Sequence, residues 1–205
     1  MKKWIGRVWL KLFGWEAVGG PTVEKKLVLI AAPHTTNWDL PFALALAFTL
    51  GLEIHWMGKS TIFKRPFGGL MRWFGGVPIE RHLRTNVVQQ MIHLFQASDA
   101  LALTVSAEGT RSRADYWKSG FYHIAYGADV PVALCFLDYE KKRGGIGRIM
   151  QLTGDVRADM DVIRSFYADK VGLRPELFGP IRLRDEAPLK RSELIHEHFE
   201  STDEV

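Results

Sequence analysis

Short apolar runs alternate with helical patterns along most of this 205-residue chain, and this alternation is the strongest constraint on its fold. Between the apolar runs, apolar residues recur at spacings of three and four, which is typical of helices with one buried face. Such alternation predicts an α/β fold: a single domain with a mixed, largely parallel sheet flanked by helices. We expect strands at 27–32, 53–57, 77–80, 100–105, 130–138 and 148–153, and helices at 39–50, 84–97, 119–127, 158–170 and 189–200.

The composition is that of a globular protein. Hydrophobic residues make up 47% of the chain and charged residues 24%, which argues against a disordered protein. The uncharged stretch 40–52 is shorter than the roughly 20 apolar residues that a membrane span needs. No secretion signal is evident in residues 1–20. The single cysteine, Cys135, lies in an apolar run, so we interpret it as a buried strand residue in a chain without an internal disulfide.

The first 15 residues combine tryptophan with lysine and arginine and contain no acidic residue. Trp4, Val8 and Leu12 recur at helical spacing, while Lys3 and Arg7 lie mostly on another side of the predicted helix. This pattern predicts an amphipathic helix on an anionic membrane surface. The alternative is a helix packed on the protein's own core. The net charge of +4 is consistent with an anionic partner but does not choose among lipid head groups, phosphates and nucleic acid.

A polar hexapeptide, His34-Thr35-Thr36-Asn37-Trp38-Asp39, directly follows the first apolar run and Pro33. Sites in parallel sheets gather where strands end and helices begin. A helix that starts near Asp39 would fold the preceding turn back and bring this carboxylate to the imidazole of His34. A carboxylate on one ring nitrogen fixes the tautomer and leaves the other nitrogen free as a base. Asp39 could instead act only as a helix cap.

A second polar cluster, Ser106-Ala107-Glu108-Gly109-Thr110-Arg111-Ser112-Arg113, directly follows the predicted strand 100–105. Glycine allows a ligand to approach the backbone closely, and arginine with hydroxyl groups suits a phosphate. The alternative is a surface turn in which Glu108 pairs with an arginine. The chain contains no phosphate-binding P-loop motif, no Gly-x-Ser-x-Gly nucleophile motif and no metal-ligand spacing.

Together, the two clusters resemble the motifs of the glycerolipid acyltransferase family, which includes the bacterial 1-acyl-sn-glycerol-3-phosphate acyltransferases. Two further blocks follow in the family's order: Gly75–Arg81 is similar to its glycine-to-arginine block, and Val130–Leu134 to its Val-Pro strand. Pro33, Pro78 and Ala133 depart from the residues that are common at those positions.

The resemblance implies a role for each motif residue. His34 would take a proton from the acceptor hydroxyl while Asp39 orients the imidazole, and the hydroxyl would attack an acyl thioester without an acyl-enzyme intermediate. Arg81 and the turn 108–111, with Lys59 as a further candidate, would hold the acceptor's phosphate. No metal or cofactor is expected beyond the co-substrate, acyl-CoA or acyl carrier protein. Residues 1–20 would associate with the membrane, and 21–205 would form the acyltransferase domain.

We therefore expect a peripheral enzyme on the cytoplasmic face of the membrane that acylates a lysophospholipid, 1-acylglycerol 3-phosphate first among candidates, in phospholipid biosynthesis. Its expected partners are the acyl donor, the lysophospholipid and an anionic membrane, and not nucleic acid. The alternatives are acyl transfer to another lyso-lipid such as a lyso-aminolipid, hydrolysis of a thioester or ester, and lipid binding without catalysis. Residues 139–205 suggest no function.

Overall fold

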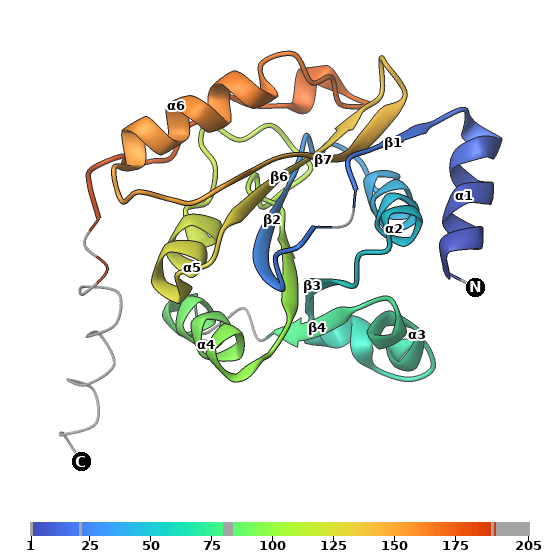
Figure 1. The fold of residues 1–205 in the computed structure, drawn as a ribbon, viewed down its shortest axis with the longest axis horizontal. Helices are drawn as coiled ribbons and strands as arrows, with labels where there is room; N and C mark the ends of the chain where they lie inside the picture. The colour runs from blue at the N-terminus through green and yellow to red at the C-terminus, as the bar shows by residue number, and fades with distance from the viewer. Residues whose placement is uncertain (1, 21, 80–83, 190, 192–205) are drawn as a thin grey trace.

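A seven-stranded sheet forms the centre of the computed structural model, which describes residues 2–20, 22–79, 84–189 and 191 (Figure 1). Its strand order is β1-β7-β6-β2-β5-β3-β4, and every neighbouring pair is parallel except β6 and β7. This confirms the predicted α/β domain with a largely parallel sheet. The strands are β1 Glu16–Val18, β2 Lys26–Ala32, β3 Ile54–Lys59, β4 Gly76–Ile79, β5 Leu101–Val105, β6 Val132–Asp138 and β7 Arg143–Met150.

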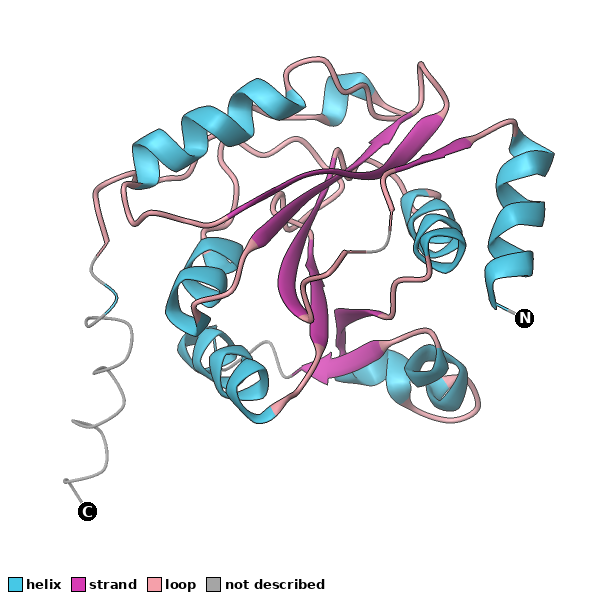
Figure 2. Ribbon diagram, viewed as in Figure 1, coloured by secondary structure: helices cyan, strands magenta, loops and turns pink. Residues whose placement is uncertain are grey.

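Helices cover both faces of the sheet (Figure 2). The α-helices of the described residues are α1 Lys2–Phe13, α2 Asp39–Leu50, α3 Gly68–Trp73, α4 Arg84–Ala97, α5 Gly120–Ala128 and α6 Val156–Tyr167. Short 3₁₀ helices occur at η1 Ser60–Phe63 and η2 Pro175–Leu177. Among the residues that the structure describes, none of the helices is long and apolar enough to cross a membrane.

Alternate residues of β2 serve two different layers, because successive strand side chains point to opposite faces of a sheet. Val28 and Ile30 are buried in the main core, together with Phe95 of α4 and Met160 of α6. Leu29 belongs to a separate cluster on the other face, the face that α2 covers. The sheet therefore has one face that is packed solid and another that borders α2.

Helix α2 is apolar apart from Asp39 and Thr49, as expected for a helix that is covered on more than one side. The sheet lies on one side of α2 and α1 on another (Figure 1). Gly6 of α1 makes this packing possible, because a Cβ atom there would lie 2.4 Å from the Ala45 carbonyl oxygen. Gly51 ends α2 in the left-handed conformation, at φ 76°.

The predicted elements agree with the structure best where their pattern is strong. Helices 39–50 and 84–97 have the bounds of α2 and α4. The predicted strand 148–153 has the wrong bounds. The observed strand β7 begins at Arg143, where glycines give a weak strand signal. The short elements β1 and α3 were not predicted, and β1 lies within the segment that we assigned to the membrane. Most of the predicted helix 189–200 lies outside the described residues.

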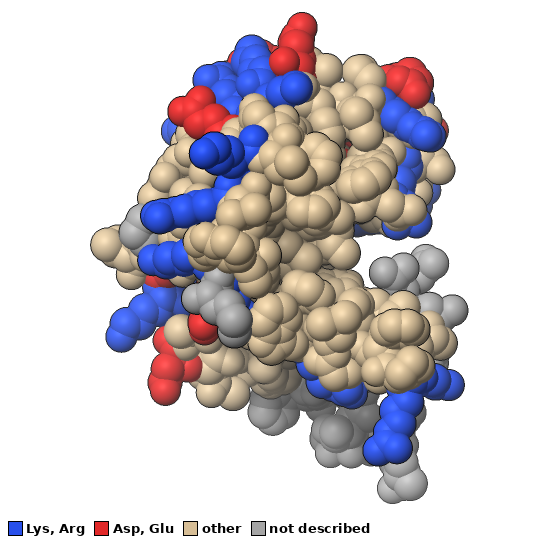
Figure 3. All heavy atoms as spheres, turned by 90° about the vertical axis from the view of Figure 1, so that its right-hand side faces the viewer, with Lys and Arg blue, Asp and Glu red and all other residues tan. Residues whose placement is uncertain are grey.

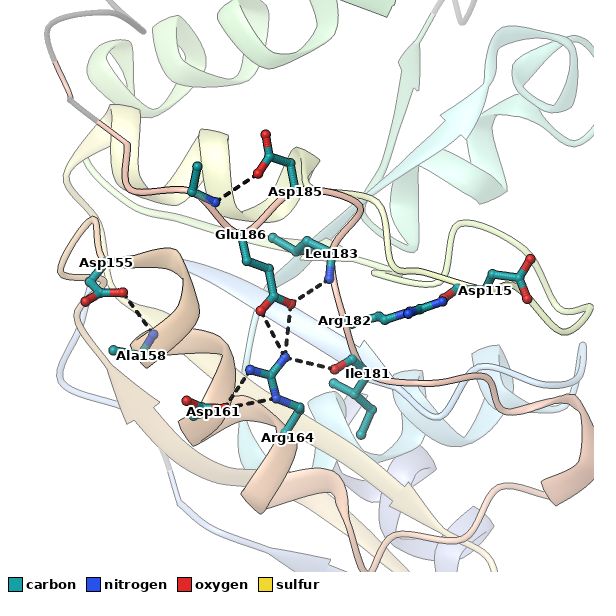
Figure 4. Close-up of polar contacts among 11 residues, drawn as sticks. Asp115, Asp155, Ala158, Asp161, Arg164, Ile181, Arg182, Leu183, Asp185 and Glu186 are labelled. Carbon is teal, nitrogen blue, oxygen red and sulfur yellow. Dashed lines mark hydrogen bonds and ion pairs between the residues drawn. The ribbon is translucent and has the colours of Figure 1, made fainter.

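The charged segment after β7 has a structural role (Figure 4). Arg164 of α6 donates to the carbonyl oxygen of Ile181 at 3.3 Å and to the Glu186 carboxylate at 3.0 Å. Glu186 in turn accepts the backbone N–H of Leu183 at 3.0 Å, and Asp155 caps α6 by accepting from Ala158 at 3.1 Å. These contacts hold the chain that follows η2 against α6.

Candidate active site

Three parallel strands end side by side at one edge of the sheet. β2 pairs with β5 on one side and with β6 on the other, so the chain segments that follow these strands meet there. His34 follows β2, Glu108 follows β5 and Tyr139 follows β6. Ligands of open α/β sheets bind outside the carboxyl ends of strands, where the connections diverge to the two sides. This edge is therefore the expected place for a functional site.

His34 and Asp39 contact each other across the turn between β2 and α2. The distance from Nδ1 of His34 to Oδ2 of Asp39 is 3.1 Å. The same oxygen accepts the backbone N–H of Thr36 at 2.9 Å, and Oδ1 accepts the Tyr139 hydroxyl at 2.8 Å. Asp39 is the first residue of α2, where the helix dipole favours a negative charge. Its carboxylate thus orders the turn and also reaches the imidazole.

The chemistry of the carboxylate fixes the proton on the imidazole. An ionised carboxylate can only accept hydrogen bonds, so Nδ1 of neutral His34 must carry the hydrogen that Asp39 accepts. The lone pair is then on Nε2. The His34 side chain keeps 26% of its exposure while that of Asp39 keeps 3%. The pair therefore has a buried orienting group and a base that a substrate can reach.

Glu108 holds the same turn from the neighbouring strand. Its buried carboxylate accepts the backbone N–H of His34 at 2.5 Å, a contact between residues 74 positions apart. Burial raises the pKa of Glu108 to about 7, the hydrogen bond from His34 lowers it in part, and the negative charge of Asp39 adds to the rise. Glu108 therefore fixes the backbone of His34 and is not the exposed partner of an arginine.

Of the other predicted phosphate-binding residues, one borders a cavity, two form the turn after β5 and two have side chains that are not described. Arg111 borders the cavity described below, together with His34. Gly109 adopts a positive φ of 68°, with the side chain of Lys118 lying across it. The hydroxyl of Thr110 accepts the backbone N–H of Ser112 at 3.2 Å. Arg81 and the side chain of Lys59 lie outside the described part of the structure.

A cavity of about 540 Å³ lies between α2 and the sheet. Leu40 and Leu50 both border it, and ten helical residues span about 15 Å, so the cavity follows most of the length of α2. Its walls are mainly aliphatic, and polar side chains occur at the edge where the strands end. The lining includes Leu29, Ala31, Ala43, Ala47, Ile54, Trp56, Ile62, Thr104, Cys135 and Leu137, with His34, Asn37, Asp39 and Arg111 at the polar edge.

Cys135 contributes only to the wall of this cavity. Burial raises the pKa of its thiol to about 12, so the thiolate is not formed near neutral pH. Within the described residues, no three His, Cys, Asp or Glu side chains are grouped so that they could hold a metal ion. Among the described residues that border the cavity, His34 can act as a base and Arg111 supplies a positive charge.

Two residues of the site were missed in the sequence. Tyr139 directly follows the predicted strand 130–138, at the same edge of the sheet as His34, so its position was a usable signal. Thr35 is buried, and its hydroxyl accepts the backbone N–H of Arg174 at 3.3 Å. That contact joins segments 139 positions apart and has no signal in the sequence.

Comparison with known proteins gives two matches. A family model described as Acyltransferase matches residues 18–136. The crystal structure of the 1-acyl-sn-glycerophosphate (LPA) acyltransferase PlsC from Thermotoga maritima is similar, with a TM-score of 0.52 and 17% sequence identity over 73% of this chain and 67% of that chain. At this identity the likeness shows a shared fold. A search of curated protein sequences found no match.

Proposed function

Because this chain belongs to the Acyltransferase family, whose model matches more than half of its residues, we propose that it transfers a fatty acyl group from a thioester to the hydroxyl of a lysophospholipid. The donor is acyl-CoA or acyl carrier protein, and 1-acyl-sn-glycerol 3-phosphate is the favoured acceptor, the reaction serving phospholipid biosynthesis. One observation carries the proposal: the His34–Asp39 pair lies at the polar edge of a long apolar cavity.

The pair supplies general-base catalysis. Nε2 of His34 takes the proton of the acceptor hydroxyl as its oxygen attacks the thioester carbonyl. Asp39 stabilises the imidazolium that forms, and the departing thiolate receives the proton as the C–S bond breaks. Such a base accelerates a reaction by about 10²–10⁴-fold, and positioning of the two substrates supplies much of the rest.

The cavity suits the acyl chain. Its aliphatic walls bury methylene groups, each worth about 0.8 kcal/mol when removed from water. The elongated shape along α2 matches an extended chain, and a thioester bound at the polar edge would lie beside His34. Arg111 at that edge is positioned to pair with the acceptor's phosphate, as guanidinium groups do. We assign the same task to Arg81 and Lys59 on the family resemblance.

The decisive experiment is an assay with radiolabelled acyl-CoA and acyl-carrier-protein donors and a panel of lyso-acceptors. The proposal predicts a diacyl product with 1-acylglycerol 3-phosphate. A product only with a lyso-aminolipid would change the acceptor. Free fatty acid as the sole product would make the protein a hydrolase, and binding without turnover would make it a lipid-binding module.

The protein also has a surface that fits a membrane. In α1, Gly6 and Leu10 are buried against α2, whereas Trp4 is 69% exposed and Leu12 75% exposed. The helix therefore packs on the protein and still presents an apolar stripe outward. Phe67, Leu70 and Trp73 around α3 are exposed too, and the Lys2 ammonium lies 4.9 Å from the Trp73 ring, which joins the two regions.

Figure 3 shows this side of the molecule, where uncharged side chains cover the middle and charged side chains, more of them Lys and Arg than Asp and Glu, lie around it. Leu40 and Ile62 are both exposed and both border the cavity, so the cavity opens among exposed apolar side chains. We propose that this side lies on an anionic membrane, at its cytoplasmic face. An acyl chain could then pass between lipid and cavity without crossing water.

A charge-reversal pair tests membrane association. Arg7→Glu on α1 should weaken binding to anionic vesicles about thirtyfold at low salt, because the reversal changes two units of charge and each contributes about 1 kcal/mol near such a surface. The matched variant Arg157→Glu on the exposed face of α6 should bind as the wild type does. High salt should reduce the difference. Equal binding by all three proteins would refute the assignment of α1.

A further inference from the structure

The Tyr139 hydroxyl donates to Oδ1 of Asp39 at 2.8 Å, across 100 positions of the sequence. Burial, followed by the bond to Asp39, raises the pKa of Tyr139 above its usual value, so the phenol remains a neutral donor. The oxygen that it contacts is the one that does not face His34. Tyr139 lies three positions beyond residue 136, where the match to the family model ends.

The ring of Tyr139 is held on two sides. Trp15 packs edge-to-face against it at 4.9 Å between ring centroids, and Phe42 does so at 5.7 Å. Trp15 and Phe42 stack on each other at 4.4 Å. The backbone N–H of Tyr139 donates to the carbonyl oxygen of Val171 at 2.9 Å. The hydroxyl therefore projects from a fixed ring on a fixed backbone.

From this geometry we propose that Tyr139 is a positioning residue for acyl transfer, which holds the Asp39 carboxylate so that Oδ2 faces Nδ1 of His34. The inference rests on the proposed function. A carboxylate is free to turn about its bond to Cβ, and Thr36 and His34 both bind Oδ2. Among the described residues, Tyr139 is the side chain that donates a hydrogen bond to Oδ1 of Asp39, so it prevents the carboxylate from rotating. Trp15, between α1 and β1, and Phe42 of α2 hold the ring of Tyr139 and so support the position of Asp39.

The chain offers a matched control in a second tyrosine–aspartate pair. The Tyr122 hydroxyl donates to Oδ2 of Asp159 at 2.6 Å, in a buried site. Asp159 also accepts the backbone N–H and the hydroxyl of Thr153, so this pair fastens the start of α6 to the main core. Tyr122→Phe therefore removes the same kind of bond at a place that does not border the cavity of His34.

Steady-state acyl transfer gives the first measurement. Tyr139→Phe keeps the ring and removes the hydroxyl, and we expect kcat to fall about tenfold or more, as for the loss of a hydrogen bond to a charged group. KM for the acyl donor should stay unchanged, because Tyr139 does not border the cavity. Tyr122→Phe should lower the melting temperature and leave kcat as it is. An unchanged kcat in Tyr139→Phe would overturn the proposal.

Nitrogen NMR of ¹⁵N-histidine-labelled protein gives a second measurement that needs no activity. The signals of His34 are identified by their loss in His34→Gln, and their shifts report which ring nitrogen carries the proton. Tyr139→Phe should change these shifts toward a tautomer mixture, and Tyr122→Phe should not. If the wild type transfers no acyl group at all, the proposed function fails while this comparison still decides the role of Tyr139.

A second variant covers the case in which Tyr139→Phe does not fold. Trp15→Leu keeps the hydroxyl and removes one ring that holds it. We expect a few-fold fall in kcat and a smaller change in the His34 signals. Full activity with an unchanged His34 spectrum would show that the aromatic contacts do not position Asp39.

Discussion

The turn at residues 34–39 and the cavity beside it are built in opposite ways. The turn places its base and its carboxylate five positions apart in one continuous segment and relies on hydrogen bonds between 2.5 and 3.1 Å. The cavity has walls from α2, from several strands and from η1, with mainly aliphatic surfaces. Under the proposed function, reactivity depends on short polar contacts, and substrate fit depends on the packing of several elements around the cavity.

Removal of the base should give the largest effect. His34→Ala should lower kcat by about 10²–10⁴-fold, the usual contribution of a general base. The melting temperature should change little, because the imidazole is partly exposed and the backbone bond to Glu108 remains. Substrate turnover and thermal unfolding measure the two effects. His93→Ala, at an exposed position of α4, is the matched control. Retained turnover in His34→Ala would remove this residue from the mechanism.

Glu108 joins the turn to the sheet, and its titration should appear in the stability of the fold. Its pKa is raised by burial from 4.5 to about 7, so between these values the folded protein holds a proton that the unfolded chain has released. The contribution of this proton to the free energy of unfolding falls as pH rises from about 4.5 to 7, and above pH 7 it no longer changes. By linkage the loss is about 3 kcal/mol, at 1.36 kcal/mol per pKa unit.

Glu108→Gln removes the titration and keeps an acceptor for the His34 N–H. Urea unfolding at several pH values should show a decline for the wild type across this range that the variant lacks. Parallel pH profiles for the two proteins would show that the Glu108 carboxyl group titrates in the folded protein as it does in water.

A change in the cavity wall should have a smaller and more selective effect. Ala43 of α2 borders the cavity, so Ala43→Phe fills part of it and should shift the preference from long to shorter acyl chains by about tenfold in kcat/KM, the scale at which apolar pockets discriminate. Leu44→Phe introduces the same ring at the next position, which does not border the cavity, and should leave the preference unchanged. Equal chain-length profiles for both variants would place the acyl chain elsewhere.

The sequence predicts the local half of this site better than the distant half. The approach of His34 to Asp39 follows from a strand end, a turn and a helix start within one short segment, and α2 has the predicted bounds. Tyr139 and Arg174 reach the same turn from 100 and 139 positions away. The end of the predicted strand 130–138 places Tyr139 at the right edge of the sheet, but the spacing of residues reveals neither contact.

The errors in the fold have a similar origin. β1 has only three residues and forms because β7 lies beside it, so its own segment gives little strand signal. The pattern of α1 indicates apolar residues on a helix, but only the packed structure shows that Gly6 and Leu10 turn inward while Trp4 and Leu12 turn outward. Propensity decides elements that are long and strongly patterned, and tertiary contacts decide the short ones.

The side-by-side arrangement of a short polar turn and a composite apolar wall has a consequence for engineering. Small-to-large exchanges on the inward face of α2 can shorten or reshape the cavity in which we propose that the acyl tail binds, while His34 and Asp39 stay unchanged. The proposed function thus predicts that one scaffold can be adapted to different fatty acids by repacking one helix, with the hexapeptide 34–39 left unchanged.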